Sequence, residues 1–589
     1  MRTTIRRVVP LALALTGCAT AAPGTSGSDD LDVFVAAQMA QRHVPGLSLA
    51  IIQDGRIVEA RAYGVTDPGG HTPVTTSTLF QAGSISKSVS ALGALRLVEQ
   101  GRLDLDADVN RTLTTWKVPS NPFTAVKPVT LRGILSHTAG LTVHGFPGYA
   151  VDVARPTLVQ VLDGEPPTNT APIRVDTAPG AMWRYSGGGY TVMQQMIVDL
   201  TGEPFPDFMR RTVLQPIGMT NSSFEQPLPP AMAAMTAGGQ YGNLQPVKGR
   251  WHVYPEMAAA GLWTTPTDLA RFAIEVQEAY AGRSSKVISR AMTRRMLTAE
   301  KQGDGLGFFL QGTGPTLLFN HGGRDEGFDA SLNALAESGQ GLVVMINAND
   351  NSNMMNRLVA FVARKYAWPG VASTYVAPVA AAAPIAVERL RAITGRYERS
   401  NNNMMTLGTL NGRLYVISDG LPDEEFVAVR DDQFQSVDRD VRLGFVRDAS
   451  GAVTRLTWTM GGTTRTAPRV GPLVSSLARQ ADPDPALTAR VDAALRAMAQ
   501  GGAAVASAAA LTPGAQRDFS RSGPWPAAVG YRGIAFVASE RVAGRGLERH
   551  GSPVDRIAYY TLTTDSGQRG LMVHLTSDGL ITDFDDVVD

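Results

Sequence analysis

The sequence predicts an α+β fold, because strand-like runs lie at both ends of a long first segment and helix-like runs fill its middle. Four runs are short and rich in β-branched or apolar residues; they cover 46–52, 56–64, 328–337 and 341–347. The first two flank Asp54-Gly55, a dipeptide typical of a tight turn between antiparallel strands. Since strands and helices do not alternate, we expect one antiparallel sheet built from both ends of the segment rather than βαβ repetition.

The helix-like stretches have apolar residues that recur every three or four positions. They cover 31–44, 84–100, 190–200, 268–281 and 353–368. The second stretch ends at Gly101, a residue type common just beyond helix ends. A short helix that runs into a loop is expected at 130–141, and 142–180 is rich in Pro, Gly and Thr and is predicted to be irregular.

Two smaller units are expected after residue 368. Residues 369–387 are rich in Pro, Ala and Val and are predicted to be a linker. Short β-rich runs then fill 388–470, with Asn411-Gly412 as a hairpin turn, and predict a small all-β, barrel-like domain or a sandwich. Residues 483–589 begin with an Ala/Leu-rich helix and end in strand-like runs, which predicts a small α+β domain.

The composition is that of a multidomain globular protein. A chain of 589 residues is too long for one hydrophobic core. Its hydrophobic content of 44% and charged content of 18% are ordinary for a protein that folds in water. The formal net charge is +1, and basic residues do not gather in stripes with aromatics, so we expect no nucleic-acid partner.

The first residues are typical of a bacterial export signal. A basic start, with Arg2, Arg6 and Arg7, precedes an apolar run at 8–15 that is too short to span a bilayer. The polar segment up to residue 30 is predicted to be a flexible tether.

Cys18 is the only cysteine of the chain. The run Leu15-Thr16-Gly17-Cys18 resembles a lipobox, in which the cysteine is lipidated and becomes the mature N-terminus. Lipidation would account for a lone thiol in an exported protein. We therefore expect a periplasmic or outer-membrane-attached lipoprotein with a lipid anchor at Cys18; cleavage near 19–22, with loss of Cys18, is the alternative.

Ser84 and Lys87 stand three residues apart at the start of a predicted helix, so their side chains share one face about one turn apart. A serine hydroxyl is a poor nucleophile until a base takes its proton. A lysine amine can be that base when burial or nearby positive charge lowers its pKa. Taken alone, Ser84 could instead cap the helix.

Two further motifs follow: Tyr-Ser-Gly at 185–187 and His-Gly-Gly-Arg at 321–324. Ser-x-x-Lys, Tyr-Ser-x and His-x-Gly in this order resemble the penicilloyl serine transferase fold, and most closely its class C β-lactamase-related branch of D-aminopeptidases, D,D-carboxypeptidases and esterases. Flanking segments at 79–84, 135–141, 216–219 and 260–270 resemble the same branch. The resemblance covers roughly residues 31–368 and implies a β-lactamase-like domain there.

The resemblance implies a role for each motif residue. Ser84 would be the acylated nucleophile, and Lys87 would share or take its proton. Tyr185 would act with Lys87 as general base and return the proton to the leaving group. A tyrosine can be a base at neutral pH only if its pKa is lowered, and positive charge on Lys87 or His321 is the expected cause. His321 stands where many relatives carry lysine and would hydrogen-bond or help hold the proton network.

The backbone N–H groups of Ser84 and Arg324 would form the oxyanion hole. Gly322 and Gly323 would leave the strand edge open to a substrate backbone. The family's Tyr-x-Asn motif has Gly187 in the asparagine's place, which puts efficient β-lactam turnover in doubt. His137 is interpreted as structural, because its segment matches a framework stretch of the family.

We therefore expect a serine hydrolase that cleaves small esters or D-amino-acid-containing amides and peptides through an acyl-enzyme on Ser84. A β-lactamase or penicillin-binding D,D-carboxypeptidase is one alternative, and a non-catalytic envelope-binding protein with the same fold is another. The chain has no Gly-x-Ser-x-Gly motif, which carries the nucleophile of α/β-hydrolases, and this argues against an α/β-hydrolase. No His, Cys, Asp or Glu grouping has metal-ligand spacing, so neither a metal nor another cofactor is expected.

Overall fold

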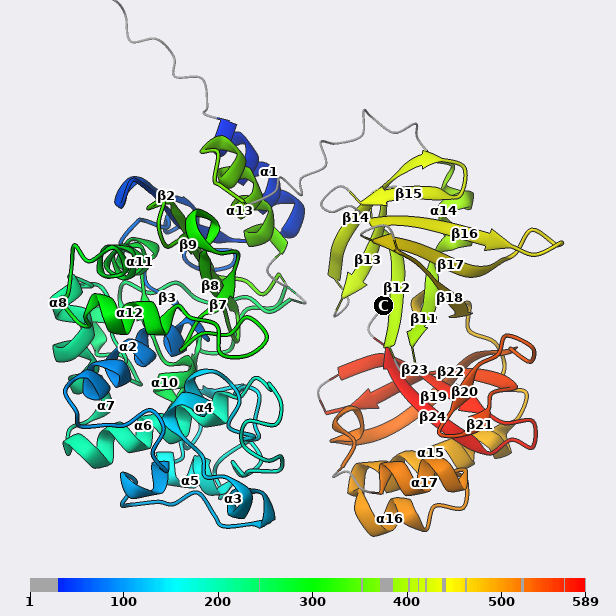
Figure 1. The fold of residues 1–589 in the computed structure, drawn as a ribbon. Helices are drawn as coiled ribbons and strands as arrows, with labels where there is room; N and C mark the ends of the chain where they lie inside the picture. Colours follow the sequence, from blue (N-terminus) through cyan, green and yellow to red (C-terminus); the bar gives the residue numbers. More distant parts are fainter. Residues whose placement is uncertain are drawn as a thin grey trace, which may run out of the picture.

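An antiparallel sheet of six strands, in the order β2-β1-β10-β9-β8-β7, organises the first part of the chain (Figure 1). Its strands are β1 (Gly46–Gln53), β2 (Arg56–Gly64), β7 (Phe309–Gln311), β8 (Leu318–Asp325), β9 (Phe328–Leu335) and β10 (Gly341–Ile346). Asp54 and Gly55 have φ values of 51° and 67°, as a tight hairpin turn requires. The hairpin pairs with β10 in the register Leu47↔Ile346 to Ile52↔Gly341. The expected sheet from both ends of the segment is confirmed.

The computed structural model describes residues 30–242, 244–350, 353–370, 385–400, 403–410, 413–418, 421–436, 441–460, 463–520, 524–565 and 567–587. The predicted leader with Cys18, residues 371–384 of the predicted linker and the Asn411-Gly412 turn lie outside these ranges.

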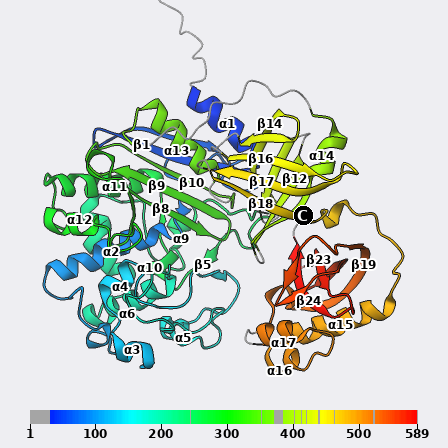
Figure 2. The same ribbon diagram turned by 45° about the vertical axis from the view of Figure 1, so that its right-hand side comes forward.

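Helices cover both faces of the sheet, which explains why β1 and β10 are buried along nearly their whole length and consist mostly of apolar residues. Alternate residues of β1 point to opposite sides. Leu49 joins one core with α1 (Asp30–Arg42) and α13 (Asn353–Lys365), whereas Ala50 joins a second core with α2 (Ile85–Glu99) and α11 (Pro266–Ala281). Figure 2 shows α1 and α13 side by side against the sheet. The second core is the larger one, and the N-terminus of α2 lies beside it.

The remaining helices of this unit are short, except for α6. They are α3 (Pro122–Val126), α4 (Leu131–Leu135), α5 (Leu158–Asp163), α6 (Gly187–Thr201), α7 (Phe205–Met209), α8 (Gln215–Ile217), α9 (Pro230–Ala233), α10 (Met257–Ala260) and α12 (Arg290–Met296). Two short strand pairs join them: β3 (Phe80–Gln81) with β6 (Trp263–Thr264), and β4 (Tyr149–Ala150) with β5 (His252–Val253). The segment 142–180, predicted to be irregular, therefore contains α5 and β4, because Thr157 caps α5 with a full capping box.

A closed barrel of eight antiparallel strands follows the short helix α14 (Val387–Ile393). The strands are β11 (Gly395–Ser400), β12 (Asn403–Leu410), β13 (Arg413–Ser418), β14 (Leu421–Arg430), β15 (Gln433–Ser436), β16 (Val441–Arg447), β17 (Val453–Met460) and β18 (Thr463–Gly471). Pairing of Arg396 with Gly471 closes the circle. The barrel confirms one of the two all-β forms that the sequence left open, and closure removes the exposed sheet edges that a sandwich would keep.

The last unit is a four-stranded sheet in the order β19-β22-β23-β24, covered by helices. Its elements are α15 (Pro485–Gln500), α16 (Gly502–Ala506), α17 (Pro513–Phe519), β19 (Tyr531–Arg541), β20 (Glu548–Arg549), β21 (Ser552–Pro553), β22 (Arg556–Thr564), β23 (Gly567–Leu575) and β24 (Ile581–Val587). Figure 1 shows this sheet, in red, directly beneath the yellow barrel. The α+β character expected for this end of the chain is confirmed.

A buried ion cluster joins the barrel to the last unit. Arg549, only 1% exposed in its side chain, lies 2.8 Å from a carboxylate oxygen of Glu398 in the barrel and 3.2 Å from one of Asp583 in β24. Apolar residues from both units, among them Val470 and Met572, pack into one shared core beside it. Buried charges need partners of opposite sign, so this cluster ties the two units together.

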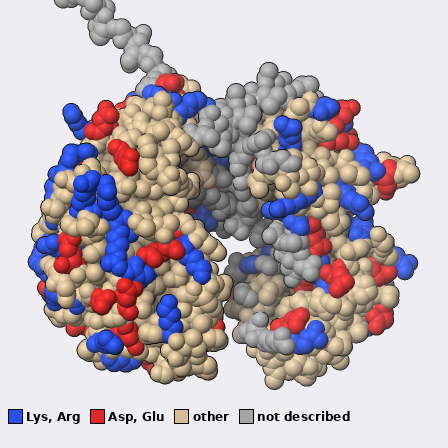
Figure 3. All heavy atoms as spheres, in the orientation of Figure 1, with Lys and Arg blue, Asp and Glu red and all other residues tan. Residues whose placement is uncertain are grey.

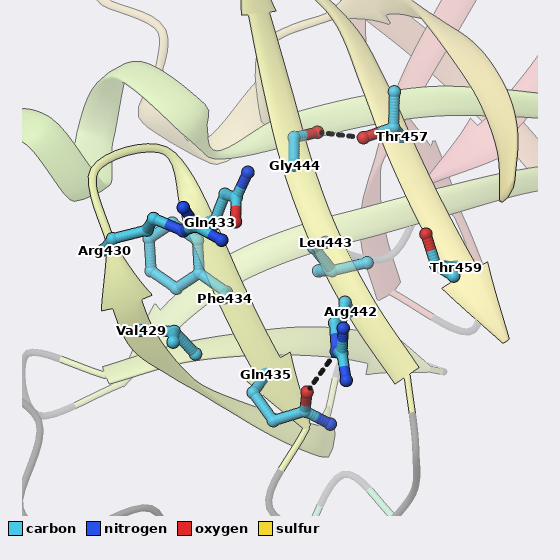
Figure 4. Close-up of a pocket in the computed structure, with 10 residues that line it drawn as sticks. All are labelled: Val429, Arg430, Gln433, Phe434, Gln435, Arg442, Leu443, Gly444, Thr457 and Thr459. Atoms are coloured by element: carbon cyan, nitrogen blue, oxygen red, sulfur yellow. Dashed lines mark hydrogen bonds between the residues drawn. The ribbon is translucent and has the colours of Figure 1, made fainter. Parts of the chain in front are cut away.

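The barrel also has a groove of about 610 Å³ across β14–β17 (Figure 4). Arg442 on β16 and Thr457 on β17 line it, and Gly444 lies beside Thr457. None of the residues predicted to carry chemistry lines this groove, so the predicted reaction site lies elsewhere.

The face drawn in Figure 3 carries charged side chains of both signs. Basic and acidic side chains are interspersed over this face. Within the described ranges, no helix has both the length and the apolar content needed to cross a bilayer.

We expect Arg549→Met to lower the free energy of unfolding by about 3 kcal/mol, because it leaves two buried carboxylates without their cation. Calorimetry of the full chain would measure this as a lower transition temperature. Arg541→Met is the matched control, since Arg541 is 78% exposed in its side chain. Equal transition temperatures for the two variants would contradict a stabilising role of the cluster.

Candidate active site

Ser84 stands directly before α2 with helical backbone angles, φ −66° and ψ −9°, and its side chain makes no capping hydrogen bond. Its hydroxyl instead accepts a hydrogen bond from the Lys87 Nζ at 2.9 Å. The alternative that Ser84 merely caps its helix therefore does not fit the structure. The hydroxyl lies partly open to solvent, next to an amine one turn further along.

Lys87 is buried, with 1% of its surface exposed. Its Nζ also donates to the Ala259 carbonyl at 2.9 Å and lies 5.0 Å from the ring centre of Tyr185. Burial lowers the pKa of Lys87 to about 7, and the negative charge of the neighbouring Asp325 opposes the change. A substantial share of the amine is thus uncharged at neutral pH and able to accept a proton.

Tyr185 lies beside both groups, but its environment shifts its pKa in the direction opposite to our prediction. Burial raises the pKa of Tyr185 above its usual range, and a hydrogen bond with Ser84 opposes this only in part. The expectation that positive neighbours lower this pKa is therefore wrong. The reason is that desolvation penalises a phenolate in the same surroundings that penalise an ammonium group. Tyr185 keeps its proton at neutral pH.

His321 on β8 is 4% exposed, and its ring centre lies 6.2 Å from that of Tyr185. Burial, followed by the charge of Lys87, lowers the pKa of His321 to about 3. The ring is therefore neutral and supplies no positive charge to Tyr185, which corrects the second part of the prediction. Its Nδ1 lies 2.5 Å from the Gly322 carbonyl, and since a carbonyl only accepts, Nδ1 carries the proton and Nε2 is left as an acceptor.

The β8 edge touches the turn before Ser84 so closely that only glycine fits. A Cβ on Gly323 would lie 1.9 Å from the Ala82 carbonyl oxygen and 3.3 Å from the Ser84 nitrogen. Gly83 has φ 51°, and a Cβ there would lie 2.4 Å from the Arg324 nitrogen. This contact brings the backbones of Ser84 and Arg324 together, as a shared oxyanion hole requires.

The side chain of Arg324 is engaged with the protein itself. Its guanidinium forms two hydrogen bonds with the Asp329 carboxylate, at 2.8 and 3.0 Å. Such paired geometry fixes the strand end beside the site. Arg324 is therefore placed to contribute its backbone N–H.

His137 lies behind Tyr185 and supports it, in line with its structural interpretation. The ring centres are 4.2 Å apart, and the His137 Nδ1 accepts a hydrogen bond from the Ser186 nitrogen at 3.1 Å. Burial and the charge of Lys87 lower the pKa of His137 well below its usual value, so this ring is neutral as well.

The sequence did not single out two aromatic neighbours of Tyr185. The ring centre of His144 lies 4.8 Å from that of Tyr185, and Phe309 lies 6.2 Å away and stacks on it. Both come from segments whose periodicity says little: a loop after α4 and the three-residue strand β7. The one available hint was that His144 closely follows the segment 135–141, which resembles the family. In the part of the chain that the structure describes, no group of His, Cys, Asp or Glu is arranged to hold a metal ion.

Comparisons with known proteins identify the family of the first part of the chain. A family model described as Beta-lactamase matches residues 31–364. The chain is 28% identical over 262 residues to penicillin-binding protein 4 of Amycolatopsis lactamdurans, which covers 44% of this chain and 66% of that protein. It is 29% identical over 216 residues to esterase EstB of Burkholderia gladioli, covering 36% and 55%.

Among solved structures, the octameric penicillin-binding protein homologue from Pyrococcus abyssi is similar, with a TM-score of 0.52 and 20% identity over 74% of this chain and 99% of that one. This likeness concerns the fold alone.

The segments matched in penicillin-binding protein 4 and esterase EstB span 66% and 55% of the lengths of those two proteins.

The rate at which a fluorophosphonate labels Ser84 should rise with pH and level off above about pH 7. Below the pKa of Lys87, which is about 7, the amine is protonated and cannot take the serine proton, so the rate should fall about tenfold per pH unit. Timed labelling followed by intact-mass analysis measures this. A rate that stays flat between pH 5 and 9 would contradict Lys87 as the base.

Proposed function

Because the chain belongs to the beta-lactamase family, whose members are serine hydrolases, we propose that it cleaves small esters or D-amino-acid-containing amides through an acyl-enzyme on Ser84. One observation carries the proposal: a buried amine with a pKa of about 7, the Lys87 Nζ, donates to the Ser84 hydroxyl at 2.9 Å. This is the geometry that an activated serine nucleophile needs. The similarity to a protein named as an esterase supports an ester as substrate.

In the first half-reaction, the uncharged Lys87 amine takes the proton of Ser84 as Oγ bonds to the substrate carbonyl carbon. The carbonyl electrons move to its oxygen, and the N–H groups of Ser84 and Arg324 are proposed to bind the resulting oxyanion. Each such donor is typically worth about 3 kcal/mol in the transition state. The new Lys87 ammonium is held by the Ala259 carbonyl and by the faces of two tyrosine rings.

The oxyanion electrons then re-form the carbonyl as the bond to the leaving group breaks, and a poor leaving group such as an amine or alkoxide must receive a proton in this step. Tyr185 keeps its phenolic proton at neutral pH and adjoins both Ser84 and Lys87. We assign it the donor's role, with the Lys87 ammonium replacing the proton it gives up. Water attacks the acyl-enzyme in the second half-reaction by the reverse sequence of proton transfers, which frees Ser84.

A second candidate is β-lactam recognition, as a β-lactamase or a penicillin-binding D,D-carboxypeptidase. The match to penicillin-binding protein 4 favours it. Gly187 disfavours efficient turnover, because it offers no side chain to a bound amide. Lasting acylation by penicillin without hydrolysis of nitrocefin would separate a penicillin-binding role from a β-lactamase role.

We also propose that the chain is exported and lipid-anchored at Cys18. This rests on the basic start, the short apolar run and the lipobox-like motif alone. Labelled palmitate fed to expressing bacteria should be incorporated by the wild-type chain and not by Cys18→Ser. Equal labelling of the two would overturn the anchor.

Ser84→Ala should abolish covalent labelling by esters, D-alanyl peptides and fluorophosphonate. Lys87→Met removes the base and should lower kcat/KM for a nitrophenyl ester by at least about a thousandfold. Tyr185→Phe should lower it by about a hundredfold only, because a nitrophenolate leaves with little help from a proton donor. Intact-mass analysis and steady-state kinetics measure these effects.

Ser88→Ala is the matched control, because Ser88 lies one turn further along the same helix and donates to the Gly307 carbonyl at 2.6 Å, away from Lys87. Its labelling should equal that of the wild type. If no acylating probe labels the folded wild-type protein, the hydrolase proposal fails and a non-catalytic binding role takes its place.

A further inference from the structure

A tight hairpin of residues 303–310 adjoins the candidate active site. Asp304 and Phe309 lie opposite each other across it as a bridged antiparallel pair. The Leu310 nitrogen donates to the Gly303 carbonyl at 2.7 Å and closes the hairpin next to this pair. The side chains of Asp304 and Phe309 therefore start from backbone positions that are fixed relative to each other.

The hairpin is also fixed to the helices around it. The Leu306 nitrogen donates to the Met296 carbonyl of α12 at 2.9 Å, and the Gly307 nitrogen donates to the Leu135 carbonyl of α4 at 3.0 Å. A Cβ on Gly307 would lie 2.6 Å from the Cβ of Ala91 in α2, so the backbone of the hairpin packs directly against that helix. Contacts this close leave the hairpin little freedom to move.

Asp304 reaches from the hairpin to Trp183, which stands two residues before Tyr185. The Trp183 indole N–H donates to the Asp304 carboxylate at 2.6 Å, and Asp304 is only 2% exposed. Burial raises the pKa of Asp304 to about 7, and the indole N–H favours the charged form. A substantial fraction of Asp304 is thus ionised at neutral pH, and a hydrogen bond to a carboxylate is stronger than one between neutral groups.

A series of packed rings leads from Trp183 to Tyr185. The Trp183 ring meets the His137 ring edge-on, with 6.4 Å between the ring centres, and the His137 ring lies 4.2 Å from that of Tyr185. Phe309 of the same hairpin stacks on Tyr185 at 6.2 Å. The hairpin therefore acts on Tyr185 twice, through the bond from Asp304 to Trp183 and through the ring of Phe309.

Asp304 also favours the protonated form of Tyr185. Burial is the main cause of the raised pKa of Tyr185, and the negative charge of Asp304 adds to it. A general acid must keep its proton until the leaving group takes it. Both the position and the charge of Asp304 are thus suited to a donor role of Tyr185.

Resting on the proposed function, in which Tyr185 is the proton donor, we infer that Asp304 is a positioning residue that holds Tyr185, through Trp183, where its proton reaches the leaving group. In this step the phenolic O–H bond breaks, the proton joins the departing oxygen or nitrogen, and the Lys87 ammonium returns a proton to the phenolate. A nitrophenolate is stable without that proton, whereas an amine or alkoxide needs it. The substrates that depend on Asp304 are therefore alkyl esters and amides.

Two esters with the same acyl part and different leaving groups test this: ethyl butyrate and 4-nitrophenyl butyrate. Trp183→Phe keeps a ring and removes the N–H donor, and Asp304→Leu removes the acceptor. Each should lower kcat/KM for ethyl butyrate at least about tenfold more than for 4-nitrophenyl butyrate. Asp304→Asn keeps an oxygen that can accept the indole N–H and should recover most of the loss seen in Asp304→Leu.

Trp116→Phe is the matched control, because the Trp116 N–H also donates to a carboxylate, that of Asp163 at the end of α5, at 3.0 Å. A purely structural effect lowers the fraction of folded protein and so changes both rates by the same factor, which is the result expected for this control. Melting temperature and fluorophosphonate labelling of Ser84 establish that each variant is folded with a competent nucleophile.

Equal losses for the two esters in Trp183→Phe and Asp304→Leu, or no loss for either, would overturn the inference while leaving the hydrolase proposal intact. Failure of the wild-type protein to cleave ethyl butyrate would overturn it as well. If in addition no probe labels Ser84, the proposed function falls with it.

Discussion

The burial of one amine governs the chemistry of this protein. Lys87 comes from the first turn of α2, a helix buried on nearly all sides, and 1% of its surface remains exposed. Burial disfavours the charged ammonium form, so a substantial fraction of the Lys87 side chains is uncharged at neutral pH. Its direct contacts are a serine hydroxyl, a backbone carbonyl and two aromatic faces, and the charge of the nearby Asp325 opposes the pKa shift only in part. They hold the amine in position without fixing its proton.

Most of the architecture could be predicted from local patterns. The Asp54-Gly55 turn and two apolar runs at the far end of the segment predicted four strands of the first sheet, β1, β2, β9 and β10. Its other two strands, β7 and β8, were not among the predicted runs. The choice between barrel and sandwich could not be made in this way. Closure depends on the pairing of Arg396 with Gly471, and no local pattern records a contact between residues so far apart in the chain.

The site was predicted as a set of residues but not as an electrostatic environment. Helical spacing pointed to Ser84 and Lys87, and motif order pointed to Tyr185 and His321. The direction of the Tyr185 pKa was predicted wrongly, because the depth of burial is a property of the folded molecule. His144 was missed for a related reason. Its place beside Tyr185 depends on glycines more than 40 positions further along, whose missing side chains make room for its loop.

Desolvation is the largest cause of the division of proton-transfer tasks between the two groups that adjoin Ser84. Burial disfavours whichever form of a group is charged, so it lowers the pKa of an ammonium and raises that of a phenol. The same dry pocket therefore presents Lys87 with its base form available and Tyr185 with its proton in place. One site can supply both an acid and a base at the same pH when its environment shifts the pKa values of two groups in opposite directions. A neutral His321 preserves this division, because a positive ring there would favour the phenolate and remove the acid.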